Sequence, residues 1–325
     1  MKCANCGTDV KKKDRDANRG RCPSCQRQFV TDPQQDGITD MQIKNAESAV
    51  SGNGMFYFSK AQLKYQLERK LRKNKRNAGI AAVVLLVIFV FALIFAFRQG
   101  SFFIPLAVFS GFIGLAVLGG RSKFSKALKG LDAVLNRWIT ANPHPKLIKA
   151  GRYQNNGQNA NLDHVSFDRV LVCDKNETVD FFLSNLFHFH YSCPVLGGNG
   201  YPQGIYQDML ARLKQNPNLK VFLVHDFSPE GVAFVRRVKT DRQWFGDGRR
   251  YDIVDLGLNV GQKKLFKAMT NKTTDRNGKV KETAELSLFQ PAALVALCGA
   301  AINEGLAFDQ VPKVADAGRN HDGYG

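Results

Sequence analysis

Two long apolar runs dominate the hydrophobic pattern of the chain. The first covers residues 78–97 and the second residues 102–120, and neither contains a charged side chain. At 1.5 Å per residue each run forms a helix about 30 Å long, enough to cross the core of a bilayer. Pro105 and the glycines of the second run weaken a helix in water but are tolerated in lipid. The pattern therefore predicts two transmembrane helices, and favours them over a buried helical hairpin.

Amphipathic patterns flank this predicted hairpin on both sides. Leu63, Leu67 and Leu71 recur at intervals of four residues, and Ser59 is placed as an N-cap ahead of them. These leucines predict a basic helix that runs directly into the first span. A similar stripe in residues 121–142 predicts a second juxtamembrane helix.

Positive charge is concentrated beside the apolar runs. Residues 1–77 carry 17 Lys and Arg against 8 acids, residues 98–150 carry 8 against 1, and residues 151–325 carry 21 against 19. The turn between the runs has only Arg98, so the positive-inside rule places both termini in the cytoplasm, at a bacterial inner membrane. The cations next to the runs attract anionic headgroups by about 1 kcal/mol per residue. We call them the basic collars: Lys70, Arg72, Lys73, Lys75 and Arg76 before the first run, and Arg121, Lys123, Lys126 and Lys129 after the second. Membrane lipid therefore explains most of the net charge of +18, which otherwise suggests nucleic acid.

Four cysteines near the N-terminus form two Cys-x2-Cys pairs, Cys3 with Cys6 and Cys22 with Cys25. Two such turns supply the closed tetrahedral set of thiolates that structural zinc prefers. A disulfide pair and a rubredoxin-like iron site are alternatives, although a cytoplasmic location argues against disulfides. The spacing predicts a structural zinc ribbon.

Beyond residue 160, short apolar strands alternate with amphipathic helices. Strands are predicted at residues 168–174, 191–196, 219–225 and 251–256. This alternation predicts a parallel sheet with right-handed crossovers. Ligands of such sheets collect outside the carboxyl ends of the strands, where Asp174, a Gly-rich turn and Asp226 are expected to meet. Two carboxylates at this rim suit Mg²⁺ bound together with a phosphate-containing ligand.

Three segments of this region resemble successive signatures of the toprim domain, in the version carried by the A subunit of topoisomerase VI. They read VLVCDKNETVDFF, PVLGGNGYPQGIYQDMLARL and VFLVHDFSPEG. The resemblance implies a Mg²⁺ site for phosphodiester cleavage or transfer, with Asp174 at the position of the first acid, normally Glu, and Asp226 at the first acid of an Asp-x-Asp pair. Ser228 replaces the second acid of that pair, and Glu230 is a candidate to compensate.

The same rim supplies the candidate ligand-binding residues Lys175, Gly198, Gly200 and Tyr201. A topoisomerase is not expected, because the relatives of topoisomerase VI use a nucleophilic Tyr on a domain for which the chain has little room ahead of the toprim-like region. The expected function is recognition of DNA, RNA or another phosphate-containing ligand, with a degenerate metal site, as in a phage-defence protein. An active Mg²⁺-dependent nuclease or phosphotransferase and a scaffold for protein partners or a homo-oligomer are the alternatives.

The predicted fold class is therefore multidomain, combining a zinc ribbon, a transmembrane hairpin and an α/β toprim-like domain. Its expected parts are a zinc ribbon (1–30), a linker (31–58), a juxtamembrane helix (59–77), two transmembrane helices (78–120), a juxtamembrane helix (121–142), a toprim-like domain (160–310) and a disordered tail (311–325).

Overall fold

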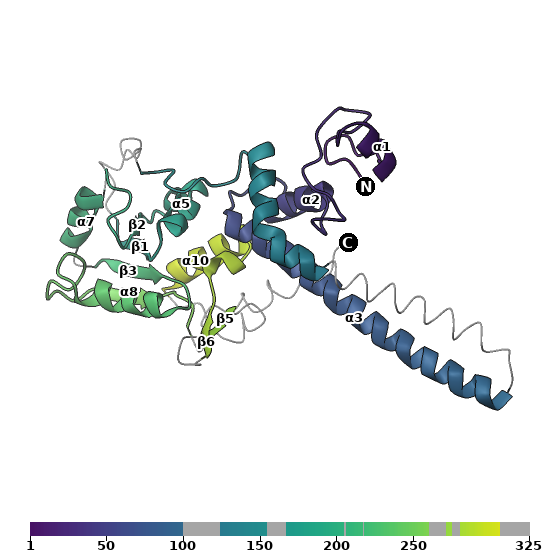
Figure 1. Cartoon of the computed structure of the whole chain (residues 1–325). Coiled ribbons are helices and arrows are strands. Elements are labelled where there is room, and N and C mark those ends of the chain that lie inside the picture. The colour runs from purple at the N-terminus through teal and green to yellow at the C-terminus, as the bar shows by residue number, and fades with distance from the viewer. Residues whose placement is uncertain are drawn as a thin grey trace. The chain divides into compact units, whose positions relative to one another are not determined.

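A computed structural model describes residues 1–99, 124–154, 167–204, 206–216, 218–259, 271–274 and 280–305. The chain divides into two compact units, which we describe separately (Figure 1). The first comprises Met1–Ala49 and Leu63–Pro145, and the second comprises Val50–Gln62 and Lys146–Gly325.

The first unit begins with a cysteine-bearing lobe that contains helix α1 (Lys12–Ala17), followed by helix α2 (Asp40–Val50). The carboxylate of Asp40 accepts hydrogen bonds from the backbone amides of Val30 at 3.0 Å and Thr31 at 2.9 Å. Part of the segment expected to be a linker is thus a helix of 11 residues. The turn residues on either side of α2 bracket a helix that buries its apolar face, including Ile43 and Ala46.

Helix α3 (Lys60–Gln99) is continuous over 40 residues. Its Lys60–Phe91 portion is long and apolar enough to cross a membrane, and the most apolar window of this portion has no buried residue. Val83 and Leu86, for example, are each 60% exposed, which suits contact with lipid rather than with a protein core. The second apolar run, residues 102–120, lies outside the described residues.

The first part of α3 packs within the first unit against a helix of residues 124–141. Lys64 and Asp132 form an ion pair at 2.6 Å between these helices. The side chains that are buried along the two helices include Leu63, Leu67, Leu71, Leu131 and Leu135. Trp138 donates a buried hydrogen bond of 2.8 Å to Glu47 of α2, and burial raises the pKa of that carboxyl. The leucines of both stripes therefore lie in the buried interface between these helices.

The second unit contains a four-stranded parallel sheet, which confirms the α/β prediction. Its strands are β1 (Arg169–Cys173), β2 (Val195–Gly197), β3 (Lys220–Val224) and β4 (Asp252–Asp255), in the order β2-β1-β3-β4. Its helices are α5 (Asn176–Ser184), α6 (Phe187–His190), α7 (Tyr206–Gln215), α8 (Pro229–Thr240) and α10 (Pro291–Glu304). A hairpin of β5 (Asn271–Thr274) and β6 (Val280–Thr283) and the 3₁₀ helix η5 (Leu286–Leu288) complete it.

Strand residues are buried on both faces of this sheet, as is typical of parallel sheets. One face packs Val172 and Leu223 into a cluster with Phe234 of α8 and Leu210 of α7. The strand order reverses between β1 and β3, because the chain leaves β1 toward one edge and returns through β3 toward the other. Such a switch point is where α/β sheets commonly bind ligands.

Candidate functional site

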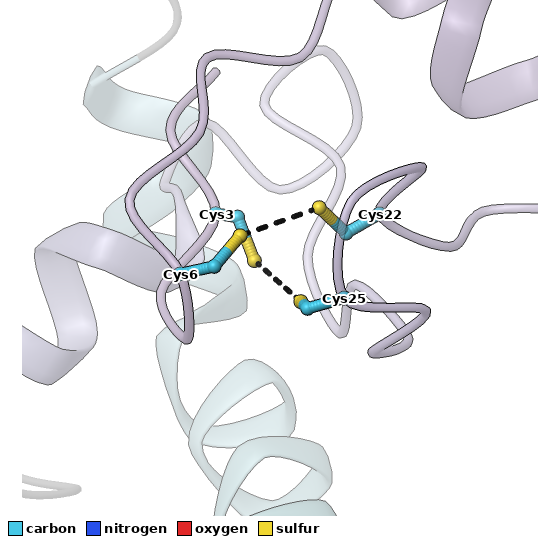
Figure 2. Close-up of side chains that lie close together, drawn as sticks. All are labelled: Cys3, Cys6, Cys22 and Cys25. Atoms are coloured by element: carbon cyan, nitrogen blue, oxygen red, sulfur yellow. Dashed lines mark hydrogen bonds between the residues drawn. The ribbon is translucent and has the colours of Figure 1, made fainter.

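The four N-terminal cysteines converge on one centre (Figure 2). The sulfurs of Cys3 and Cys25 lie 3.7 Å apart, those of Cys6 and Cys22 lie 3.6 Å apart, and all four lie within 4.8 Å of one another. Thiolates about 2.3 Å from a tetrahedral zinc ion lie about 3.8 Å from each other, whereas a disulfide needs about 2.05 Å. The four cysteines are thus compatible with a zinc ribbon and not with disulfides.

This lobe is built from two copies of one turn, 19 residues apart. The amide of Gly7 donates to the carbonyl of Cys3 at 3.0 Å, and the amide of Gln26 donates to that of Cys22 at 2.8 Å. Both donors have left-handed backbone, with φ of +76° at Gly7 and +59° at Gln26. The repeat explains why all four thiols point inward: each turn aims its pair at the same side.

Thiolate formation is favoured at part of this centre. Hydrogen bonding with the side chain and backbone of Thr8 lowers the pKa of Cys6 to about 6, and backbone hydrogen bonding lowers the pKa of Cys25. Burial raises the pKa of Cys3 to about 11. Because metal binding requires thiolates, Cys6 and Cys25 offer ready ligands, and the buried Cys3 would be deprotonated by the ion itself.

A second candidate site lies at the switch point of the sheet. Asp174 follows β1 and Asp226 follows β3, and the amide of Asp226 donates to Oδ2 of Asp174 at 3.2 Å. Oδ1 of Asp174 is buried and has no hydrogen-bond partner in the part of the chain that the structure describes. Burial, and then the charge of Asp226, raise the pKa of Asp174 to about 6. An oxygen with no partner in such a place is suited to a cation.

Asp226 is held from two sides. Its carboxylate accepts a hydrogen bond from the ammonium of Lys175 and another, at 2.7 Å, from the amide of Leu286 in η5. Lys175 and Leu286, together with Glu285 and Gln62, line a hollow of about 50 Å³ beside Asp226. Lys175 is half exposed and Asp226 is buried. A divalent cation at the two aspartates would therefore compete with Lys175 for Asp226.

Ser228 and Glu230, the other candidate acid positions, belong to the start of α8. Ser228 caps this helix, because its hydroxyl accepts a hydrogen bond of 3.1 Å from the amide of Gly231. Glu230 is exposed in the first turn of the same helix. The structure brings Asp174, Lys175 and Asp226 together and gives Ser228 a local structural role.

The Gly-rich turn after β2 is explained by packing. A Cβ on Gly198 would lie 2.5 Å from the ring of Phe234, and Gly200 has a φ of +85°. Tyr201 is 3% exposed and donates its hydroxyl to the buried carboxylate of Asp180. These three predicted ligand-binding residues therefore shape the edge of the sheet.

A buried histidine that the sequence analysis did not single out lies beside the aspartates. His225 places Nδ1 2.7 Å from the carbonyl of Asp226 and Nε2 3.0 Å from Asp255. Burial opposes protonation, but the hydrogen bonds to Asp255 and Asp226 outweigh it and raise the pKa of His225. A Cβ on Gly257 would lie 2.0 Å from its ring. The sequence signal for the contact between His225 and Asp255 was the presence of a histidine and an acid at the ends of two neighbouring strands.

Comparison of the chain with protein-family models, with curated proteins and with solved structures found no match in any of the three. The toprim resemblance therefore rests on the quoted motifs alone.

Proposed function

We propose that the chain is a membrane-anchored cytoplasmic protein that recognises a phosphate-containing ligand through a divalent cation at the carboxyl edge of its sheet, in the manner of a degenerate toprim domain. The observation that carries this proposal is the contact between Asp174 and Asp226 at the switch point, with one buried oxygen of Asp174 lacking a partner among the described residues. Two carboxylates plus substrate phosphates are the usual ligands of protein-bound Mg²⁺.

The residues fit a cation only in part. Asp174 has an oxygen to offer, but both oxygens of Asp226 already accept hydrogen bonds, from Lys175 and Leu286. When bound, the cation would neutralise the carboxylates and attract a phosphate. Lys175 would then be released toward solvent, where its ammonium is placed to contact the same phosphate.

The anchor is the second part of the proposal. Helix α3 supplies one span, the run at 102–120 supplies the other, and the basic collars place both termini in the cytoplasm of an inner-membrane protein. The zinc ribbon and the α/β unit would then share one side of the membrane, with anionic lipid as a constant partner.

Calorimetric titration of the full chain in zwitterionic micelles tests the proposal. We expect pyrophosphate to bind in the presence of Mg²⁺ but not of EDTA, and Asp174→Asn to reduce its affinity at least tenfold. The matched control is Asp208→Asn, which removes an exposed acid from the first turn of α7. Binding that survives both EDTA and Asp174→Asn would refute the proposal.

Cleavage of nucleic acid is the second candidate function. It is favoured by the meeting of Asp174 and Asp226 at one edge of the sheet, because two carboxylates can hold the Mg²⁺ that assists phosphodiester cleavage. Supercoiled plasmid incubated with the full chain and Mg²⁺ or Mn²⁺ distinguishes the two functions. Nicking that is abolished by Asp174→Asn and by Asp226→Asn would establish the enzyme, and intact plasmid would leave binding alone.

A further inference from the structure

Residues 146–154, which we name the basic strap, run along the surface of the second unit and are fixed at several points. At one end the amide of Phe58 donates to the carbonyl of Lys146 at 3.0 Å, and the amide of Ile148 donates back to Phe58 at 2.9 Å. Farther along, the amide of Gly151 donates to Asp180 at 2.9 Å. A segment outside the sheet that is held this firmly presents its side chains in fixed places.

The side chains of the strap are basic and aromatic. The ammonium of Lys146 lies 4.2 Å from the ring centroid of Tyr57, and the guanidinium of Arg152 lies 4.8 Å from the same centroid and 5.7 Å from that of Tyr153. The cation–π contacts of Arg152 order its long side chain while leaving its charge available. Lys149 and Arg152 are exposed.

The strap contacts the turn that follows β2, at the carboxyl edge of the sheet. The amide of Tyr153 donates to the hydroxyl of Tyr201 at 3.0 Å, and Tyr201 belongs to the turn that follows β2. A Cβ on Gly197, at the end of β2, would lie 3.3 Å from Oδ1 of Asn176, two residues after Asp174. The cations of the strap thus continue from the carboxyl edge of the sheet along the surface of one unit.

We propose that the basic strap binds the backbone of single-stranded nucleic acid, whose neighbouring phosphate occupies the aspartate edge. This inference rests on the proposed function and specifies the ligand of that function as a polymer. A small phosphate compound would need only the carboxyl edge of the sheet, where Asp174 and Asp226 lie, and not the strap. Ordered cations beside aromatic rings are the usual means of holding single strands, and a guanidinium plane can stack on a base.

Lipid is the less favoured partner of the strap. Tyr57 lies just ahead of α3, and about 18 helical residues separate the start of that helix from the apolar run. This length corresponds to about 27 Å of helix. The basic collars adjoin the apolar runs in sequence and the strap does not, so the collars are the expected site for lipid headgroups.

Fluorescence anisotropy of a labelled 20-nucleotide oligo(dT) with the full chain in zwitterionic micelles tests the inference. We expect Lys149→Glu with Arg152→Glu to weaken binding at least tenfold. Removal of two phosphate contacts should also reduce the slope of log K against log salt by about 1.4. The matched control carries Arg236→Glu and Lys239→Glu, which make the same charge change at exposed positions of α8, and should bind within threefold of wild type.

Equal losses in the two double variants would overturn the strap and indicate nonspecific attraction. Absence of oligonucleotide binding by a protein that still binds Mg²⁺ with pyrophosphate would also overturn it, and would leave the proposed function intact. Retained Mg²⁺-dependent pyrophosphate binding by the strap variant shows that it is folded.

Discussion

The backbone amide of Asp226 donates a hydrogen bond of 3.2 Å to Oδ2 of Asp174, so the residues that follow β1 and β3 are joined directly. This one hydrogen bond does not compensate for the burial of the Asp174 carboxylate beside the carboxylate of Asp226. Burial, followed by the charge of Asp226, raises the pKa of Asp174 from 3.8 to about 6. Burial and the neighbouring charge of Asp226 therefore make the edge of the sheet less stable at a pH where Asp174 is ionised and a cation could bind.

The first prediction is a loss of stability as the pH rises in the absence of metal. Below pH 3.8 Asp174 is protonated in the folded and the unfolded chain. Between about pH 4 and pH 6 only the folded chain keeps the proton, so the free energy of unfolding falls, by about 3 kcal/mol in total. Asp174→Asn should lack this loss. Hydrogen exchange of the β1 and β3 amides, corrected for intrinsic rates, measures the difference.

Asp252→Asn, at the exposed start of β4, is the control and should keep the pH dependence of wild type. Mg²⁺ at pH 7.5 should slow exchange in wild type and not in Asp174→Asn. An identical pH profile for wild type and Asp174→Asn would contradict the assigned role of burial.

The position of the aspartate pair was predictable because it follows from topology. Asp174 and Asp226 end two apolar strands, and parallel strands present their carboxyl ends at one edge. The role of Ser228 was not predictable in the same way. Its place in the motif suggested a lost acid, whereas local helix chemistry makes it the N-cap of α8. Tyr201 likewise matched a motif, but its contact with Asp180 depends on tertiary packing.

Helix α2 shows a second limit of the pattern. Its apolar residues are few, and the glycines and prolines around it predicted a linker. The helix is held by contacts distant in sequence, such as the hydrogen bond from Trp138 to Glu47. The zinc ribbon, in contrast, was predictable from the cysteine spacing. Two Cys-x2-Cys turns direct four thiols to one centre, where a metal ion is the usual occupant.

The second prediction concerns the metal of the ribbon. Cys22→Ser with Cys25→Ser removes one turn of ligands, and a site with two thiolates does not retain structural zinc. We expect about one zinc ion per chain in wild type and none in the variant, as measured by elemental analysis after dialysis. Cys298→Ala removes a buried thiol from α10 and should leave the zinc content unchanged. Iron in the wild-type protein would contradict the assignment of zinc.

The third prediction uses the repeat within the ribbon. Gln26 adopts a φ of +59°, which disfavours any residue with a Cβ, while the equivalent Gly7 adopts +76° without strain. Gln26→Gly should stabilise the lobe by about 1 kcal/mol, and Gly7→Ala should destabilise it by a similar amount. The cost of Gly7→Ala comes from the backbone conformation alone, because the added Cβ meets no atom within 4 Å.

A chelator competition measures both changes, because folding of the lobe and zinc binding are coupled. One kcal/mol corresponds to about a fivefold change in apparent zinc affinity. The exposed hydrogen bond of 3.2 Å from the Gln26 side chain to the carbonyl of Pro23 is lost in Gln26→Gly and offsets part of the gain. Opposite signs for the two variants are required; weaker zinc binding in both would refute the equivalence of the turns.

The fourth prediction concerns the turn after β2. A Cβ at Gly198 would approach the Phe234 ring to 2.5 and 2.9 Å, closer than side chains tolerate, so Gly198→Ala must displace the ring from the core beside β1 and β3. We expect a loss of about 1–3 kcal/mol in the stability of the second unit, measured by hydrogen exchange of the sheet amides. Phe234→Leu alone also destabilises, by opening space in the core. If the clash is the cause, the two changes combined should cost clearly less than the sum of the single changes. Additive losses would instead place the cost of Gly198→Ala in its backbone.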